Sequence, residues 1–264
     1  MTQLTLAPLS NFDVGAVLAG AVSFGAYRLR ALDGGGALAA FAVGTATFGA
    51  LGVPGAAVLL AFFVTSVALS RVGRARKARL FADVGKTGPR DGAQVLANGG
   101  AAAVCALLAL WIDARYAIAF AGAFAAATAD TWGTEIGALS NARPRSMLGF
   151  RPVAAGLSGG ITLLGTGAEI AGSILIAVVA QVLRPHAFLA IACAGIAGAA
   201  IDSLLGASLQ SLRWCPNCKR ATEREPHGCG ANTSPMRGVG WIGNDAVNFA
   251  STLGGAAVAF ALAR

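Results

Sequence analysis

Long apolar runs separated by short polar segments cover most of the sequence. A helix needs about 20 mainly apolar residues to cross a bilayer, and eight runs approach that length. They lie at 12–28, 35–52, 54–70, 93–112, 116–139, 156–183, 187–211 and 242–262, with a tight join at Gly52, Val53 and Pro54. The pattern predicts an all-α fold, a polytopic membrane bundle of about seven or eight helices. We expect residues 1–264 to form one transmembrane domain, with the polar segment 212–240 inserted before the last helix.

Composition excludes several other classes of protein. Hydrophobic residues make up 56% of the chain and charged residues only 12%, about half the roughly 25% that is usual in a soluble globular domain. A soluble enzyme, a disordered chain and a disulfide-stapled secreted domain are therefore poor fits. The 36 glycines suit membrane helices, because small residues let neighbouring backbones approach closely in lipid.

The basic residues predict how the chain is oriented. If the segment after the first run is cytoplasmic, 17 of the 20 Lys and Arg residues are cytoplasmic, and only Arg115, Arg184 and Arg264 are not. The 17 are Arg28, Arg30, Arg71, Arg74, Arg76, Lys77, Arg79, Lys86, Arg90, Arg143, Arg145, Arg151, Arg213, Lys219, Arg220, Arg224 and Arg237. The positive-inside rule then places both termini outside the cytoplasm. The net charge of +8 is explained by topology, and we expect no nucleic-acid partner.

Five acidic residues lie within the apolar runs: Asp130, Glu135, Glu169, Asp202 and Asp245. Charges inside a membrane are expensive and usually functional. In the predicted topology four of the five fall near the cytoplasmic ends of their helices, and Glu169 lies deeper. This convergence predicts an acidic cavity that opens to the cytoplasm and exposes a substrate site there.

Polar side chains recur at helical spacing near these acids. Asp91, Gln94 and Asn98 share one helix face, as do Asn244 and Asn248, which lie beside Asp245. Further stripes contain Ser158, Thr162 and Glu169, and Ser203 and Gln210. We interpret all of these as candidate substrate-binding residues. Asp130 and Glu135 are five residues apart, roughly 140° around a helix, so they need not hold one ion unless the helix is irregular at Gly133.

Several carboxylates beside a basic segment suggest phosphate chemistry. Mg²⁺ prefers oxygen ligands and is usually held by one or two carboxylates together with substrate phosphates. The candidate magnesium ligands are Asp130, Glu135, Asp202 and Asp245. Basic residues between 71 and 90 would supply the charge stabilisation on which phosphoryl transfer depends. For most of them a topological or lipid-headgroup role is the better interpretation, but we assign Lys77 and Arg90 to the site.

The polar segment before the last helix carries the spacing C-x2-C-x8-H-x-C, formed by Cys215, Cys218, His227 and Cys229. Three thiols and one imidazole can close a tetrahedral zinc site, and a cytosolic loop is kept reduced. We favour a structural zinc knuckle. The alternatives are free thiols with a solvated histidine, or a redox CxxC motif that lacks a thioredoxin-like context.

Several motifs follow one another in order and together carry a resemblance. They are Arg90-Asp91-x-x-Gln94-Val95-x-Ala97-Asn98-Gly99-Gly100, Ala129-Asp130-Thr131-Trp132-Gly133-Thr134-Glu135-Ile136-Gly137, Gly156-x-Ser158-Gly159-Gly160-Ile161-Thr162-x-x-Gly165-Thr166, Asp202-Ser203-x-x-Gly206-Ala207-x-x-Gln210 and Asn244-Asp245-x-Val247-Asn248. From about residue 40 to 262 the chain resembles a polytopic membrane family long left as a domain of unknown function. Its best-understood member is the plant phytyl-phosphate kinase of the tocopherol pathway.

The resemblance implies a kinase that turns an isoprenoid monophosphate into its diphosphate, with magnesium and a nucleoside triphosphate, CTP being favoured. It implies that Lys77, in a stretch from Ser66 that matches a family pattern, and Arg90 neutralise phosphate charge. Gly159, Gly160 and Gly165 would allow close approach of the prenyl tail or phosphate. Because no transit segment is recognisable, we expect a prokaryotic member in the plasma membrane, in contact with lipid.

A transporter or flippase for a cation or a lipid-like substrate is the alternative. Buried acids and glycine-rich broken helices would serve it equally well. A transporter needs its charges near the midplane of the membrane, with access from both faces. Most of the acids here are predicted at one face, which favours the enzyme, whereas Glu169 favours the transporter.

Overall fold

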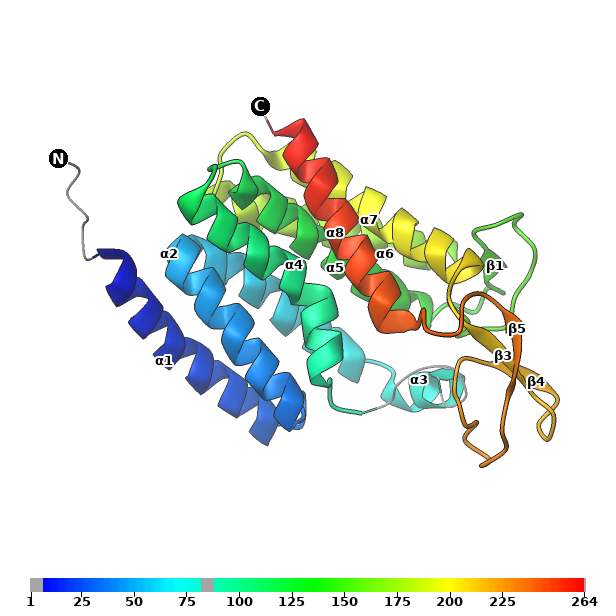
Figure 1. The fold of residues 1–264 in the computed structure, drawn as a ribbon. Helices are drawn as coiled ribbons and strands as arrows, with labels where there is room; N and C mark the ends of the chain where they lie inside the picture. Colours follow the sequence, from blue (N-terminus) through cyan, green and yellow to red (C-terminus); the bar gives the residue numbers. More distant parts are fainter. Residues whose placement is uncertain (1–6, 82–87, 264) are drawn as a thin grey trace.

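Eight α-helices form an elongated bundle in the computed structural model, which describes residues 7–81 and 88–263. In chain order they are α1 (Ala7–Arg28), α2 (Gly34–Arg71), α3 (Arg74–Phe81), α4 (Gly92–Trp111), α5 (Tyr116–Gly137), α6 (Leu163–Val179), α7 (Phe188–Ser208) and α8 (Asn244–Leu262). A 3₁₀ turn, Ala180–Val182, extends α6. Five of the described helices, α2, α4, α6 with its extension, α7 and α8, are long and apolar enough to cross a membrane. The predicted class, a helical membrane bundle, is confirmed (Figure 1).

The long helix α2 is two arms joined by a sharp break. Gly52 has φ 60° and ψ −150°, a conformation outside the helical region that glycine adopts without steric penalty. Pro54 follows near the start of the second arm, where its missing N–H is not needed for an intrahelical bond. The two arms therefore correspond to the predicted runs 35–52 and 54–70.

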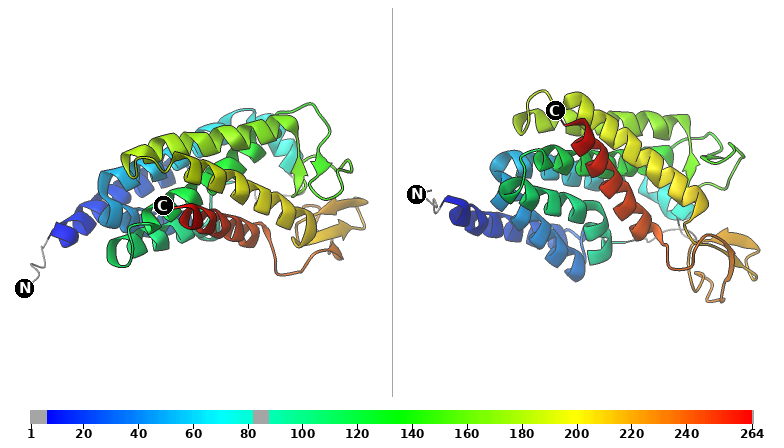
Figure 2. Two further views of the ribbon diagram at one scale, coloured as in Figure 1. Left: turned by 90° about the horizontal axis from the view of Figure 1, so that it is seen from above. Right: turned by 45° about the horizontal axis from the view of Figure 1, so that its top comes forward.

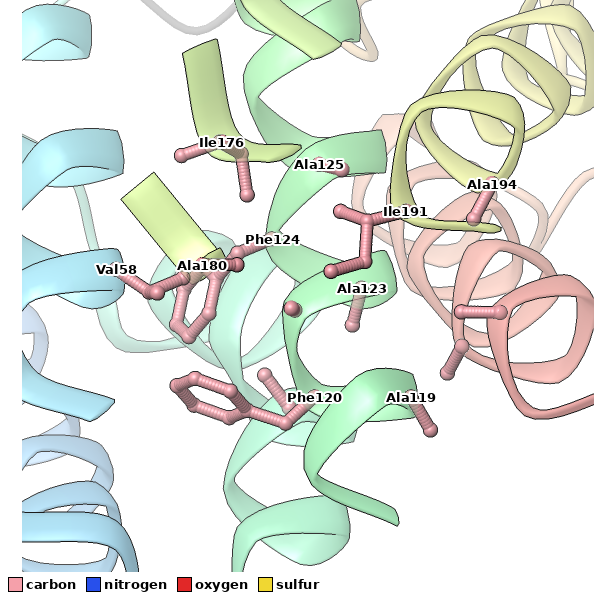
Figure 3. Close-up of a cluster of buried hydrophobic side chains, with 14 of the residues drawn as sticks. Val58, Ala119, Phe120, Ala123, Phe124, Ala125, Ile176, Ala180, Ile191 and Ala194 are labelled. Carbon is pink, nitrogen blue, oxygen red and sulfur yellow. The ribbon is translucent and has the colours of Figure 1, made fainter. Parts of the chain in front are cut away.

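Helix α5 occupies the centre of the bundle. It packs against α2, α4, α6, α7 and α8, and α1, at the edge, packs against α2 (Figure 1). Phe120 and Phe124 of α5 stack edge to face with ring centroids 5.1 Å apart. Val58 of α2, Ile176 of α6 and Ile191 of α7 are fully buried around them (Figure 3).

Small residues bring the neighbouring helices close to α5. A Cβ added to Gly122 would lie 2.3 Å from the Cβ of Ala259 and 2.8 Å from the backbone oxygen of Gly255. Across the bundle, large apolar side chains such as Leu38, Val53 and Leu189 are exposed on its outside. Such a surface suits lipid rather than water.

The predicted run 156–183 is partly wrong. Residues 156–162 are not helical, and α6 begins only at Leu163. Gly156 and Gly159 have φ of 93° and 75°, a left-handed conformation that ends any helical course, and Thr162 caps α6 by accepting a hydrogen bond from the Gly165 N–H at 3.0 Å. Ser158 and Thr162 therefore precede the helix that carries Glu169, and the three do not form a helical stripe.

Two small sheets were not predicted from the sequence. Strand β1 (Arg145–Ser146) pairs antiparallel with β2 (Gly160–Ile161). In the segment 212–240, β3 (Leu212–Cys215) lies between β4 (Arg220–Thr222) and β5 (Ser234–Arg237), and both neighbours are antiparallel to it. We call this three-stranded sheet and its loops the ribbon. Its strands are too short and too polar to produce a recognisable alternating pattern.

The two ends of the bundle differ. Helices α1, α5 and α7 end, and α4, α6 and α8 begin, at the end that also carries α3 and the ribbon (Figures 1 and 2). We call this the basic end, because most of the predicted cytoplasmic Lys and Arg residues lie in its loops. Lys86 and Arg264 lie outside the described residues. That the basic end faces the cytoplasm stays a prediction of the positive-inside rule.

Candidate functional site

A cavity of about 1360 Å³ opens at the basic end. Its walls come from α3, the ends of α5 and α7, the starts of α4, α6 and α8, the loop 155–162 and the ribbon. Of the predicted catalytic and substrate-binding residues, Lys77 alone is not in the wall. Those that line the cavity are Arg90, Asp91, Gln94, Asn98, Asp130, Glu135, Ser158, Gly159, Gly160, Thr162, Glu169, Asp202, Ser203, Gln210, Asn244, Asp245 and Asn248.

Asp130 and Asp202 form a carboxylate pair between α5 and α7. The two carboxylates lie close enough to interact directly, and the Oδ2 atom of Asp202 is buried without a hydrogen-bond partner among the described residues. Glu169 of α6 adds a third negative charge near both. Its side chain fits there because Gly133 has no Cβ, which would lie 2.6 Å from the Glu169 Cγ. Carboxylates this close repel one another unless they share a proton or a cation.

Glu135 faces a different neighbour. Its Oε2 atom lies 2.7 Å from the Lys77 Nζ, which also donates to the backbone oxygen of Leu69 at 2.7 Å. Lys77 is buried and outside the cavity wall, so the structure places its charge on Glu135 rather than on a bound phosphate. Arg90 lines the cavity near Glu135; burial lowers the pKa of Arg90, and the Glu135 charge opposes that shift.

The four predicted magnesium ligands do not converge on one point. Helix α5 is continuous through Gly133, so Asp130 points to α7 and Glu135 to Lys77. Among the described residues, the acids of the cavity do not form a group of three within 4.8 Å. Asp130 and Asp202 fit a magnesium ion best, because Mg²⁺ is commonly held by two carboxylates and substrate phosphates. Asp245, in the first turn of α8, lines the same cavity.

Several of the polar residues also shape the ends of helices. Asp91 and Gln94 form a capping box at the start of α4: the Asp91 Oδ1 accepts from the Gln94 N–H at 2.9 Å, and the Gln94 Oε1 from the Asp91 N–H at 3.3 Å. Asn98 donates to the backbone oxygen of Gln94 at 2.9 Å. These bonds fix the start of α4 at the cavity wall and give part of the predicted stripe a structural role.

The predicted role of the glycines is not what the geometry indicates. A Cβ on Gly159 would lie 2.3 Å from the Ala207 backbone nitrogen, and one on Gly165 would lie 3.1 Å from the Gly133 backbone oxygen. On Gly160 it would meet the Leu157 backbone oxygen at 3.1 Å. The missing side chains thus make room for the protein's own backbone, although all three residues border the cavity.

Glu223 of the ribbon is a cavity residue that the sequence did not single out. Its Oε1 accepts from the Ser158 N–H at 3.0 Å and its Oε2 from the Gln210 Nε2 at 2.8 Å; Gln210 also donates to the Ser158 Oγ at 2.8 Å. Burial raises the pKa of Glu223. No signal in the sequence separates it from the other charges of a polar loop, since what marks it is its contact with Ser158, 65 positions away.

An apolar slot of about 60 Å³ adjoins the cavity between α2 and α4. Val43, Leu59 and Phe63 of α2 form one wall, and Val95 and Gly99 of α4 belong to the other. The slot and the cavity share Phe62, Arg90, Gln94 and Asn98. A polar compartment therefore borders an apolar one at Arg90.

The four Cys and His residues of the predicted zinc knuckle lie together in the ribbon. One ligand atom from each of Cys215, Cys218, His227 and Cys229 falls within 4.8 Å of all the others. A hydrogen bond with His227, whose Nδ1 is 3.1 Å from the Cys229 Sγ, lowers the pKa of Cys229 to about 6. A thiol that ionises this readily is a good metal ligand.

Comparison with known proteins gives relatives from plants and archaea. Protein PGR of Arabidopsis thaliana is 32% identical over 266 residues, which cover 90% of this chain and 91% of that protein. The uncharacterized membrane protein MJ0933 of Methanocaldococcus jannaschii is 34% identical over 182 residues, covering 68% and 75%. Protein VTE6, chloroplastic, of Arabidopsis thaliana is 28% identical over 199 residues, covering 70% and 60%.

No solved structure matches the chain. The family described as integral membrane protein DUF92 matches residues 17–256, a range that includes every motif on which the resemblance rested. The chain belongs to the DUF92 family of integral membrane proteins.

Proposed function

We propose that this protein is a phosphotransferase that converts a prenyl monophosphate into the diphosphate, with a nucleoside triphosphate as donor. The observation that carries the proposal is the junction of the large charged cavity with the apolar slot at Arg90. A prenyl phosphate with its head group in the cavity and only the first carbons of its tail in the slot matches this junction. The volume of the cavity also exceeds that of a typical small-ligand site, about 300–1,000 Å³. It therefore leaves room for a second substrate.

Three helix N-termini favour phosphate in the cavity. Helices α4, α6 and α8 all begin in its wall, and the N-terminus of a helix attracts anions through its free N–H groups and its dipole. Asp91 and Thr162 cap α4 and α6. Gly243 precedes α8 and supplies no side-chain cap, so the first turn of α8, with Asn244 and Asp245, can offer its N–H groups to a nucleotide phosphate.

The cavity wall is richer in carboxylates than in guanidinium groups, so phosphates can bind there only with cations. Asp130 and Asp202 would hold magnesium, with Asp245 or Glu169 as a further oxygen donor. Magnesium would neutralise the charge that develops on the transferring phosphoryl group. Arg90, Asn98 and Asn248 would hydrogen-bond the phosphate oxygens.

In the proposed reaction an oxygen of the prenyl monophosphate attacks the terminal phosphorus of the nucleotide. The bond to the bridging oxygen breaks, and the nucleoside diphosphate leaves with the electron pair. Because the attacking phosphate is already an anion, no strong general base is needed. The resemblance to the plant phytyl-phosphate kinase suggests CTP as the donor, and the distribution of basic residues suggests that the cavity opens to the cytoplasm.

A transporter or flippase remains the alternative, since buried acids and broken helices would serve it too. Glu169, the residue that favoured transport, lines the same cavity as the other acids. The other half of the bundle is filled around Phe120, Phe124 and Ile191. An acidic site at one end above a filled apolar core supports the enzyme.

The proposal is tested by turnover of the full-length protein in detergent or nanodiscs. Phytyl and geranylgeranyl monophosphates are offered with Mg²⁺ and either CTP or ATP, and the prenyl diphosphate is measured by mass spectrometry. We expect product from the parent protein and none from Asp130→Asn. Asp113→Asn, at a partly exposed acid of the opposite end, is the matched control and should retain activity. Folded parent protein that forms no diphosphate with any pair of substrates would reject the kinase and favour transport.

The tail site has a separate test on α4. Gly99→Ala narrows the slot, because the added Cβ would lie 3.1 Å from the Val43 Cγ1. It should raise the KM for geranylgeranyl monophosphate but leave that for dimethylallyl monophosphate unchanged. Val104→Ile, at an exposed position of the same helix, should affect neither substrate. Equal effects on the long and the short substrate would show that the tail lies elsewhere.

A further inference from the structure

We propose that Cys215, Cys218, His227 and Cys229 bind one zinc ion, and that this ion holds the ribbon so that Glu223 reaches into the cavity wall. The zinc would therefore hold the ribbon in place, and the ribbon in turn would shape the wall of the cavity between the helices. The inference does not depend on the proposed function, because it concerns the ribbon and its contact with the cavity whatever reaction occurs there.

The geometry of the four side chains suits tetrahedral zinc. The Sγ atoms of Cys215 and Cys229 are 3.6 Å apart. Zinc bound to thiolates at about 2.3 Å in a tetrahedron separates its sulfur ligands by about 3.8 Å. The N–H of Cys218 points to the Cys215 Sγ at 3.5 Å, which turns the Cys218 side chain back towards the same point. With four protein ligands the site is closed, so the zinc is structural.

The ribbon has little else to stabilise it. Among the residues of its three strands, only Cys215 and Thr222 are buried, and all four residues of β5 are exposed. A sheet of this size does not supply enough apolar core to fold on its own, and domains below about 40 residues usually need a metal or disulfides. Arg213 adds polar support by donating to the Thr233 Oγ1 at 2.7 Å and by pairing with Glu225. Zinc supplies the missing folding free energy.

The position of Glu223 connects the zinc to the cavity. It lies between Cys218 and His227, so zinc ligands fix both ends of the segment that carries it. Both of its carboxylate oxygens accept hydrogen bonds, one from the Ser158 N–H and one from Gln210. If the zinc leaves, the two ends of this segment are released. The two hydrogen bonds are then too weak to offset the conformational entropy that the free loop would lose on becoming ordered.

The first experiment measures zinc in the full-length purified protein by mass spectrometry of the metal. We expect about one zinc per chain in the parent and less than about a tenth of that in Cys218→Ser. Cys193→Ser, at an exposed cysteine of α7, is the matched control and should retain the metal. Parent protein without zinc, or Cys218→Ser with unchanged zinc, would overturn the proposal, as would a disulfide between Cys215 and Cys229.

The second experiment follows hydrogen exchange in the segment around Ser158. Removing zinc from the parent with a chelator, or by Cys218→Ser, should make the Ser158 amide exchange about ten-fold faster. Glu223→Ala should speed the same amide while the zinc content stays unchanged, which separates the two links of the inference. Because chelation acts on folded parent protein, the test stands even if Cys218→Ser fails to fold. If the exchange rate of the Ser158 amide did not change when the zinc was removed, the metal would not shape the cavity.

Discussion

The two halves of α5 differ in their surroundings: the first half is packed among other helices, and the second half lines the cavity. From Ala117 to Ala129 every residue is buried among the neighbouring helices. From Asp130 onward the helix lines the charged cavity, with Thr131, Thr134 and Glu135 in its wall. One half of α5 is held by packing alone, and the other half bears groups whose charges must be compensated.

The second half explains why the most enclosed helix does not qualify as a membrane span by composition. Helix α5 is absent from the described helices that qualify as membrane spans by composition, although it lies at the centre of the bundle. Asp130 and the polar residues that follow it lower the mean hydropathy of the helix. The first half is apolar, and its small alanine and glycine side chains permit close packing against other helices. The residues that line the cavity therefore lower the hydropathy of a helix whose other half is apolar.

The largest effect is expected in the charged half, at the carboxylate pair. Asp130→Asn and Asp202→Asn should each lower kcat/KM for phosphoryl transfer by about 10³-fold or more, because several kcal/mol of charge stabilisation depend on the metal. If both acids hold one ion, as proposed, the double variant should be far less impaired than the product of the two effects. Turnover of the three variants and the parent checks this, and independent, multiplying losses would show that the acids do not share an ion.

The Lys77 and Glu135 pair sharpens the comparison, because it is charged yet serves the fold. Lys77→Met should lower the free energy of unfolding by about 3 kcal/mol, since it leaves a buried carboxylate without its partner. Adding Glu135→Gln should recover much of that loss. A double-mutant cycle on unfolding in detergent measures the coupling. If Lys77→Met instead raised only the KM for the phosphate substrate, Lys77 would be a phosphate ligand as the sequence predicted.

The packed half is tested at Gly122. Gly122→Val should destabilise the protein by about 1–3 kcal/mol through overpacking, because the added atoms would meet Ala259 and Gly255. Turnover per folded molecule should stay unchanged. Gly25→Val in α1, where nothing lies within 4 Å of an added Cβ, serves as the control. A turnover loss larger than the stability loss would mean that the two halves of α5 are not separable.

The smallest effect is a pH dependence of opposite sign in two acids outside the helices. Burial raises the pKa of Glu223, so its contribution to stability is complete below its unfolded pKa of about 4.3 and is lost as the pH rises through its folded pKa. The Arg115 side chain lowers the pKa of Asp113. The contribution of Asp113 to stability is therefore present above its unfolded pKa of about 3.9 and is lost as the pH falls through its folded pKa. Melting temperatures are measured at several pH values. Glu223→Gln should remove only the loss of stability at rising pH, and Asp113→Asn only the loss at falling pH.

The sequence predicts the site best where a charge interrupts an apolar run. Asp130, Asp202 and Asp245 are visible in this way, and their placement at one end follows from the alternating course of the helices. Lys77 is a different case, because its partner Glu135 is 58 residues away along the chain and only the tertiary fold brings the two side chains together. Spacing within one helix cannot report such a contact.

Loops limit the prediction for a similar reason. Residues 156–162 continue an apolar run, but the left-handed Gly156 and Gly159 and the capping Thr162 end it before α6. The glycines are visible in the sequence, yet glycine is so frequent in this chain that it does not distinguish a break from close helix packing. Glu223 was missed because its role arises from a tertiary contact of the ribbon and not from any local pattern.

The placement of the chain ends has a practical consequence. Helix α1 begins and α8 ends at the end of the bundle opposite the cavity (Figure 1). An affinity tag or a fluorescent reporter joined ahead of α1 or after α8 would therefore be attached on the side of the bundle away from the site. The protein can be immobilised on a sensor surface through either tag with its cavity turned towards the solution, so nucleotide and lipid-phosphate binding can be measured by surface methods without blocking the entrance.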